Sequence, residues 1–310
     1  MAENDKELFH AQSSEMCGVN CQEESGVDSI SYIAELWRDF KKNKGAIFGL
    51  IILGVIIVTA IISTFLIDYE TQIVQMNIPE MFQKPSLEHW CGTDNFGRDI
   101  FLRLIYGTRY SLLIGVCSVM FSLLIGTTLG ILAGYFGGVL EQIIMRVVDV
   151  FSPIPSMLLA VCLTTAFGQG MIVLMAAIGV AAAPAFAQVA RASVLTVREQ
   201  EFIEAARASG AKEYHIILRH VLPNALAPVL VQTTLQVANA IVAASGLSFL
   251  GLGVPTPMPE WGAMLSEGRA FIRDYSYMTL FPGLAIMITV LAINMIGDGL
   301  RDAMDPKLKR

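Results

Sequence analysis

Residues 201–224 (EFIEAARASGAKEYHIILRHVLPN) place acidic, basic and histidine side chains between two long apolar runs. The early acidic residues and the central Ala residues favour a helix, and Gly210 can end that helix in a left-handed conformation. The following stretch, AKEYHIILRHVL, predicts a second short helix that Pro223 ends. We therefore predict an elbow of two short helices that lies in water and is held there by another molecule.

A second polar set lies within an apolar run, where Gln232, Gln236 and Asn239 follow one another at spacings of four and three. This spacing puts all three on one helical face. Polar side chains in a membrane face a water-filled path or the bundle interior. Two interpretations remain open: the residues line a water-filled path, or they only join helices by hydrogen bonds.

A third polar set follows the first apolar run and contains two glycines that suggest a tight turn. Its members are Gly92, Thr93, Asp94, Gly97, Arg98 and Asp99. The charges of Asp94, Arg98 and Asp99 predict local ion pairs that order a loop. The alternative is a contact with a separate protein.

The composition excludes several classes of protein. Apolar residues make up 54% of the 310-residue chain and charged residues only 15%, against roughly 25% in soluble domains. The formal net charge of −6 provides no broad basic surface for nucleic acid. The chain has no GxxxxGK[ST] segment and no HExxH segment. We therefore expect no ATP site, no catalytic residues and no cofactor in this chain.

The cysteines predict neither a disulfide framework nor a metal centre. Cys17 and Cys21 have a spacing that can bind a metal, but no second pair or histidine lies close to them. Cys117 and Cys162 fall inside apolar runs, where they act as small hydrophobic residues. We expect no bound metal.

The apolar runs predict an all-α membrane protein with six transmembrane helices. About 20 apolar residues span a bilayer as helix, and backbone groups in lipid must be satisfied internally. The expected spans are 46–67, 111–134, 144–166, 171–190, 226–250 and 279–299.

Lys and Arg residues predict the orientation in the membrane. Of the 21 such residues, 15 lie in the N-terminal tail, at the start of the third span, in and around residues 201–224, or at the C-terminal end. The positive-inside rule then places both termini and the elbow in the cytoplasm. Residues 68–110 and 251–278 become external loops. The first run begins near Ala46, too far from the start for a cleaved signal, so it is expected to remain as a span.

Two smaller features concern packing and the N-terminal tail. Gly126, Gly130 and Gly134 recur at four-residue spacing on one face of the second span, which predicts a closely packed helix or subunit interface. Residues 1–29 predict a disordered cytoplasmic tail. Residues 30–44 (ISYIAELWRDFKKNK) predict an amphipathic helix on the inner membrane surface, or an extension of the first span. Pro153 and Pro155 are expected to kink or locally unwind the third span.

Three segments together resemble one family. Glu204-Ala205-Ala206, Gly210 and Leu222-Pro223 resemble the EAA loop of ABC-importer permeases. GTDNFGRDIFLRLIYGTRYSL (92–112) resembles a segment of the dipeptide, oligopeptide and nickel permeases, although Leu102 replaces the usual Ser. SFLGLGVPTPMPEWGAML (248–265) resembles the segment after the fifth helix of the same permeases. His220 replaces an aliphatic residue of the wider family, which is common in this branch. The chain resembles the C-type partner of the permease pair.

The resemblance implies a fold, a set of partners and a location. The fold would be that of type I ABC-importer permeases, with a cytoplasmic coupling (EAA) loop. The partners would be a related second permease, two cytoplasmic ATPase subunits that bind ATP and Mg, an extracytoplasmic substrate-binding protein and membrane lipid. The location would be the cytoplasmic (inner) membrane of a bacterium or archaeon. Residues implied in coupling to the ATPase are Glu204, Ala205, Ala206, Arg207, Gly210, Leu222 and Pro223.

Glu204 is the charge that we assign to the coupling contact, with Arg207 and Lys212 as candidate salt-bridge partners. The alternative is a solvated helix face. An elbow fixed between two spans would turn the motion of a cytoplasmic partner into helix tilting.

The expected organisation and cargo follow from the same resemblance. Residues 30–85 would hold the amphipathic helix, the first span and the start of the external loop. Residues 86–108 would form the external GTD/GRD segment, 109–301 the ABC transmembrane type-1 domain, and 302–310 a cytoplasmic tail. The cargo would be di- or oligopeptides, with nickel or another metal chelate as the alternative. No residue that selects between these cargoes can be identified from the sequence.

Overall fold

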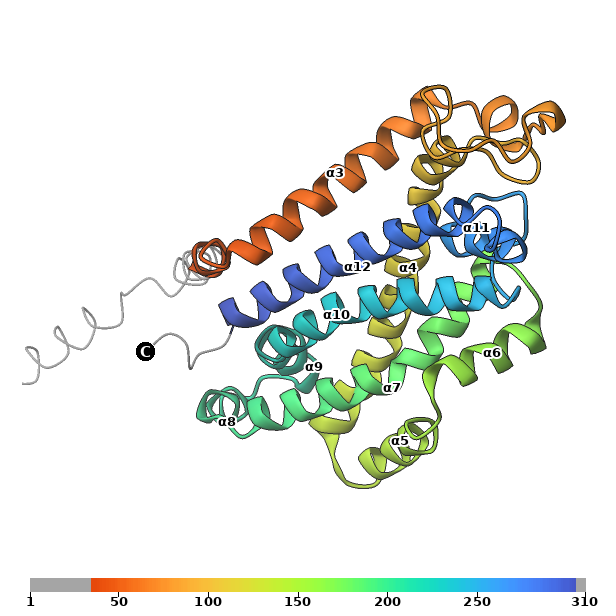
Figure 1. Ribbon diagram of the computed structural model, residues 1–310. Coiled ribbons are helices and arrows are strands. Elements are labelled where there is room, and N and C mark those ends of the chain that lie inside the picture. The colour runs from red at the N-terminus through yellow and green to blue at the C-terminus, as the bar shows by residue number, and fades with distance from the viewer. Residues whose placement is uncertain (1–34, 305–310) are drawn as a thin grey trace, which may run out of the picture.

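The computed structural model describes residues 35–304. The predicted disordered tail (1–29), the first residues of the predicted amphipathic helix (30–34) and most of the predicted C-terminal tail (305–310) lie outside that range. Five helices are long and apolar enough to cross a membrane (Figure 1). They are α3 (Lys44–Leu66), α4 (Ile100–Phe136), α7 (Met171–Arg198), α10 (Leu222–Phe249) and α12 (Tyr277–Met304). Within residues 35–304 the only strand-like feature is one isolated bridge between Thr93 and Asp99. The all-α membrane fold is confirmed.

The third expected span, 144–166, is present as two helices separated by a sharp bend and not as one continuous helix. The helix α5 (Gly138–Phe151) and the helix α6 (Ser156–Phe167) are bent by 87° at the break. The break contains Pro153 and Pro155. Proline has no N–H to donate and disfavours helical geometry in the residue before it; Ser152 still has helical angles, whereas Pro155 is extended, with a ψ of 124°. The predicted interruption at these prolines is confirmed.

The helix α4 begins at Ile100, not at 111 as the hydropathy indicated. The Asp99 side chain accepts a hydrogen bond from the Leu102 backbone N–H and caps the helix. Polar side chains in the first turns of α4, such as Arg103, are buried among partners from distant segments. An apolar run therefore marks only part of this helix.

The face of Gly126, Gly130 and Gly134 packs α4 directly against α7. A Cβ atom built on Gly126 would lie 2.4 Å from the carbonyl oxygen of Ala183, and one on Gly130 would lie 2.4 Å from that of Ala187. Only glycine permits this approach of the two backbones. The expected close packing is present, and it joins two helices of the same chain.

The helix α3 lies along α12, as Figure 1 shows. Asn43 caps α3 by accepting a hydrogen bond from the Ala46 backbone N–H, and its amide donates to Asp302 of α12. Residues 35–40 are helical, but a turn at 41–42 separates them from α3. The proposed continuous extension of the first span is therefore wrong.

The helices form a bundle with two different ends. We call one end the elbow end; it carries α8 (Glu201–Ala208) and α9 (Glu213–Ile216). We call the other the loop end; it carries the π-helix η1 (Tyr69–Val74), the 3-10 helices η2 (Ile78–Glu80) and η4 (Arg269–Phe271), and the helix α11 (Trp261–Gly268). The two ends lie at opposite sides of the bundle in Figure 1.

Candidate functional site

The elbow consists of α8 and α9, which are joined at Gly210. The φ angle of Gly210 is +79°, the left-handed conformation that ends a helix at little cost only in glycine. Ile203 of α8 and Ile216 of α9 are fully buried in one cluster with Val194 of α7 and Val221. The inner side of the elbow is therefore anchored by its own small core.

The predicted end of the second short helix at Pro223 is wrong. The helix α9 passes directly into the π-helix η3 (Ile217–Val221) and then into α10, in which Pro223 occupies the first turn. The missing N–H of a proline is tolerated in the first turn, and the preceding π-helix accommodates the altered hydrogen bonding. The elbow and α10 are consequently one continuous helical path, in which Leu222 is half-buried and Pro223 exposed.

The ion pair within the elbow differs from the one expected. Arg207 Nε lies 3.4 Å from Glu213 Oε1, whereas Glu204 and Lys212 form no ion pair within residues 35–304. The hydroxyl of Tyr135, at the end of α4, donates to Glu213 Oε2 and accepts a hydrogen bond of 3.4 Å from Arg207 Nη2. Glu204, Ala205 and Arg207 are exposed, and Ala206 is half-buried. Tyr135 thus holds both helices of the elbow against α4.

Two arginines of α7 bind the end of α4 and the start of α5. Arg198 Nη1 donates to the carbonyl oxygens of Gly134 and Tyr135, at 3.3 and 3.0 Å. These carbonyls belong to the last turn of α4, where the helix dipole favours a cation. Arg191 Nε donates to Glu141 of α5 over 2.7 Å. The last turns of α4 and the start of α5 are therefore fixed to the same helix that leads into the elbow.

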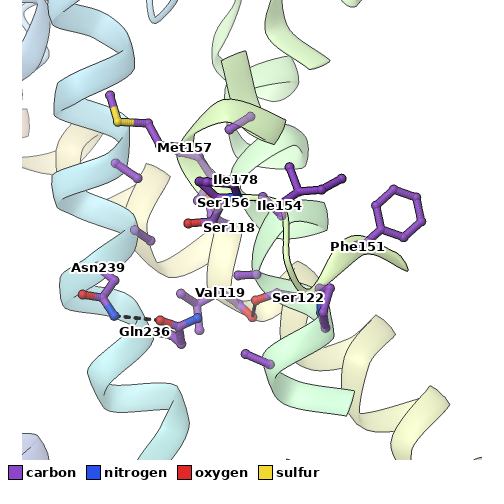
Figure 2. Close-up of a pocket in the computed structure, with 18 of the residues that line it drawn as sticks. Ser118, Val119, Ser122, Phe151, Ile154, Ser156, Met157, Ile178, Gln236 and Asn239 are labelled. Atoms are coloured by element: carbon purple, nitrogen blue, oxygen red, sulfur yellow. Dashed lines mark hydrogen bonds between the residues drawn. The ribbon is translucent and has the colours of Figure 1, made fainter. Parts of the chain in front are cut away.

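A cavity of about 630 Å³ lies between α4, the α5–α6 break, α7 and α10 (Figure 2). Its lining is mostly apolar but includes several serine, glutamine and asparagine side chains, and we call it the polar cavity. Gln236 and Asn239 of α10 line it, and Asn239 Nδ2 donates to Gln236 Oε1 over 2.8 Å. In Figure 2 the Gln236 side chain extends from α10 toward Val119 and Ser122 of α4. Gln232 does not line the cavity and is half-buried on α10.

Sequence reasoning missed the hydroxyl and amide groups on the opposite walls of this cavity. They are Ser118 and Ser122 of α4, Ser152 and Ser156 at the break, and Gln188 of α7. Gln188 Nε2 donates to Ser152 Oγ over 3.1 Å, while the fully buried Ser118 Oγ has no hydrogen-bond partner within residues 35–304. No residue of the lining is charged. The cavity therefore offers neutral donors and acceptors to whatever enters it.

At the loop end, four buried charges join the 86–108 segment to α11. Arg98 Nε lies 2.7 Å from Asp94 Oδ2, and Arg98 Nη2 lies 2.8 Å from Glu267 Oε2. Arg103 Nη1 contacts the same two carboxylates, at 2.5 and 2.8 Å. Asp94, Arg98 and Arg103 are each at most 3% exposed. The ion pair between Asp94 and Arg98 is local, as the sequence suggested, but Arg103 and Glu267 were not foreseen.

The remaining residues of the GTD/GRD segment shape its turn. Gly97 has a φ of +71°, and a Cβ atom there would lie 1.8 Å from the carbonyl oxygen of Asn77. Gly92 also has a positive φ, of +77°. Thr93 Oγ1 donates to the carbonyl oxygen of Glu80 over 2.5 Å. Asp99 binds the ring of His89 over 2.7 Å in addition to capping α4. From Cys91 onward the segment is folded and largely buried, whereas Leu87 and Trp90 before it are exposed.

The helix α11 is also fixed to α4. Glu260, fully buried, accepts hydrogen bonds from the backbone N–H groups of Gly262 and Ala263, at 2.8 and 2.9 Å. Burial raises the pKa of this carboxyl. The backbone N–H of Trp261 donates to Ser111 Oγ of α4 over 3.1 Å. The loop end thus forms one connected layer over the helices.

Comparisons with known proteins agree with this arrangement. Residues 126–310 match the family model of the binding-protein-dependent transport system inner membrane component. Residues 31–85 match the N-terminal transmembrane domain of oligopeptide transport permease C. The chain is similar to solved structures of the methionine ABC transporter MetNI in inward-facing conformations, with a TM-score of 0.55 and 22% identity over 66% of this chain and 97% of that chain. That likeness supports the type I permease fold.

Curated relatives are similar over nearly the whole chain. The dipeptide transport system permease protein DppC of Alkalihalophilus pseudofirmus is 47% identical over 91% of this chain and 92% of its own length. The glutathione transport system permease protein GsiD of Pectobacterium atrosepticum is 42% identical over 89% of this chain and 91% of its own. The di/tripeptide transport system permease protein DppC of Pseudomonas aeruginosa is 41% identical over 90% and 93%.

These matches and the spanning helices indicate a multi-pass inner membrane protein whose family works with ATPase and binding-protein partners. The chain belongs to the binding-protein-dependent transport system inner membrane components, the permease subunits of ABC importers.

Proposed function

We propose that this chain is one of two related permease subunits of an ATP-driven importer of di- and oligopeptides. The relatives named as dipeptide, di/tripeptide and glutathione permeases support a peptide cargo, as does the match to the oligopeptide permease C domain. ATP and Mg would be bound and ATP hydrolysed by two separate ATPase subunits. The permease itself performs no covalent chemistry.

The elbow is the proposed contact with the cytoplasmic ATPase. The observation that carries this proposal is its continuity with α10: the same helical path runs from Glu213 to Phe249 and passes the polar cavity. Glu204 on α8 is exposed and forms no ion pair within residues 35–304, so it is free to meet a basic group of a partner. The exposed aromatic side chains of Phe202 and Tyr214 add apolar contact area.

The polar cavity is the proposed contribution of this subunit to the translocation path. Gln236 and Asn239, together with the exposed hydroxyl groups of Ser152 and Ser156, can exchange hydrogen bonds with peptide amides as the cargo passes. Gln232 lies one helical turn nearer the elbow end and would continue this line of amides. The second permease would supply the other half of the path.

The elbow end is proposed to face the cytoplasm and the loop end the exterior. The excess of Lys and Arg at the elbow end supports this orientation. The buried charges of Asp94, Arg98 and Glu267 then hold a firm external layer. An extracytoplasmic binding protein would deliver the cargo onto that layer.

Affinity purification of the tagged chain, followed by uptake assays, tests this proposal. We expect a second permease and ATPase subunits to co-purify. Reconstituted vesicles with the binding protein should then take up labelled di- or oligopeptides when ATP is supplied to the ATPase side. Uptake of nickel but not of peptides would contradict the cargo, and saturable ATP binding by the isolated chain would contradict its role as a permease subunit.

A further inference from the structure

A groove separate from the polar cavity opens on the outside of the bundle. It has a volume of about 530 Å³ and lies between α3, α4, α10 and α12. Its walls are almost wholly apolar. The residues that define its course are Leu53, Ile57, Leu113, Val116, Val237 and Ile293. One lining residue is charged: Arg109 of α4.

Arg109 lies at the level where a bilayer core ends. Its Nη1 is 3.5 Å from Thr64 Oγ1, within the last turn of the apolar helix α3. Its guanidinium lies 3.8 Å from the ring centroid of Tyr106 and 4.7 Å from that of Tyr110. Tyrosine rings of this kind gather at the headgroup level of membranes. The groove therefore runs from the headgroup level into the hydrocarbon region.

The charge of Arg109 has no counter-ion within residues 35–304. No carboxylate lies within ion-pair distance of it, and its buried Nε has no hydrogen-bond partner. The nearest acid in sequence to Thr64, Asp68, accepts hydrogen bonds from the Glu70 backbone N–H and from Thr71 Oγ1. A partly buried cation without a counter-ion is costly. The site favours an anion.

From this geometry we infer that the groove binds one anionic phospholipid, whose phosphate pairs with Arg109 and whose acyl chain lies along Leu113 and Val116. The guanidinium supplies charge-assisted hydrogen bonds to phosphate oxygens. Arg109 and Val116 are about 10 Å apart along the helix axis. The phosphate would therefore lie beside Arg109, and the acyl chain would lie deeper, beside Val116. Stacking on the two tyrosine rings pre-orients the guanidinium for this role.

Lipid retention by the assembled importer tests the inference. The complex is reconstituted in nanodiscs of phosphatidylcholine with phosphatidylglycerol, extracted, and analysed by native mass spectrometry. We expect phosphatidylglycerol to be retained in preference to phosphatidylcholine. Arg109→Gln should lower this preference by about tenfold, as the loss of a charge-assisted contact implies. Arg109→Lys should keep much of it. Arg273→Gln, an exposed loop-end control, should keep all of it.

A second variant tests the chain-binding part of the groove. Val116 is exposed on the groove wall, and Val116→Trp should fill the groove and release the lipid although Arg109 is intact. If Arg109→Gln or Val116→Trp retained as much phosphatidylglycerol as the unsubstituted protein, the inference would be overturned. It would also be overturned if these variants lost the second permease subunit with no change in lipid retention, because the groove would then be covered by protein.

Discussion

The hydroxyl of Tyr135 at the end of α4 donates a hydrogen bond to the carboxylate of Glu213 in α9, 78 positions further along the chain. Arg207 of α8 reaches both groups, so one tyrosine joins the two short helices of the elbow to the bundle. The elbow can therefore pass a displacement to α4 as well as to α10. None of the three residues contacts the polar cavity.

Tyr135→Phe should loosen the elbow without unfolding the bundle. The lost hydrogen bond involves a carboxylate that is about half exposed, so we expect a local cost of only about 1 kcal/mol. Hydrogen exchange of residues 201–216 should accelerate, while exchange in α3 stays unchanged. Tyr275→Phe at the loop end is the control. If residues 201–216 exchanged at the same rate in the Tyr135 variant as in the unsubstituted protein, the Tyr135 hydroxyl would not stabilise the elbow.

Gly130→Ala should destabilise the fold because the added Cβ meets the backbone of α7. The nearest atom would be the carbonyl oxygen of Ala187 at 2.4 Å, and overpacking of this kind costs about 1–3 kcal/mol. Gly54→Ala on α3 is a matched control, since a Cβ there meets nothing within 4 Å. Thermal unfolding in detergent should distinguish the two. Equal melting temperatures for the Gly130→Ala and Gly54→Ala variants would contradict the tight packing of α4 on α7 at Gly130.

Arg103→Gln should be among the most destabilising changes at the loop end. It leaves the buried carboxylates of Asp94 and Glu267 with one cation fewer, and breaking a buried ion pair costs about 3–5 kcal/mol. The double variant Arg103→Gln/Glu267→Gln should recover part of this loss, because it removes one charge of each sign. A double-mutant cycle on unfolding free energies measures the coupling. A coupling near zero would contradict the four-charge network.

Asn239→Leu should slow peptide uptake while the subunits still assemble. The substitution removes an amide from the polar cavity and its hydrogen bond to Gln236. Uptake by reconstituted vesicles should fall severalfold, whereas Thr128→Val, on the exposed side of α4, should leave uptake unchanged. If the Asn239 variant took up peptide as fast as the unsubstituted protein, Asn239 would not be part of the translocation path.

The sequence predicted the elements whose signals are local. The span 46–67 corresponds to α3 within two residues, because its apolar run ends where the helix ends. The span 279–299 likewise falls inside α12. Gly210 breaks the elbow as expected, since its left-handed φ is a property of one residue. The four-residue spacing of Gly126 and Gly130 also identified a real packing face.

Features that depend on distant partners could not be predicted. The first turns of α4 contain Arg103, whose burial depends on Asp94 and on Glu267, 164 positions away, which pair with it. Arg207 pairs with Glu213 and not with Glu204, because the turn at Gly210 brings α9 back alongside α8. Pro223 does not end a helix, because a π-helix precedes it. Ser118 can be assigned to the wall of the cavity only once α10 is placed opposite α4.

The most direct test of the central claim, that the elbow couples this permease to its ATPase, is the Glu204→Lys substitution. Membrane insertion, pairing with the second permease, ATPase co-purification and ATP-driven uptake are measured together. Glu70→Lys, the same charge change at an exposed site of the loop end, is the control. We predict that Glu204→Lys leaves insertion and pairing intact but abolishes ATPase association and uptake. Association and uptake equal to those of the control would contradict the account.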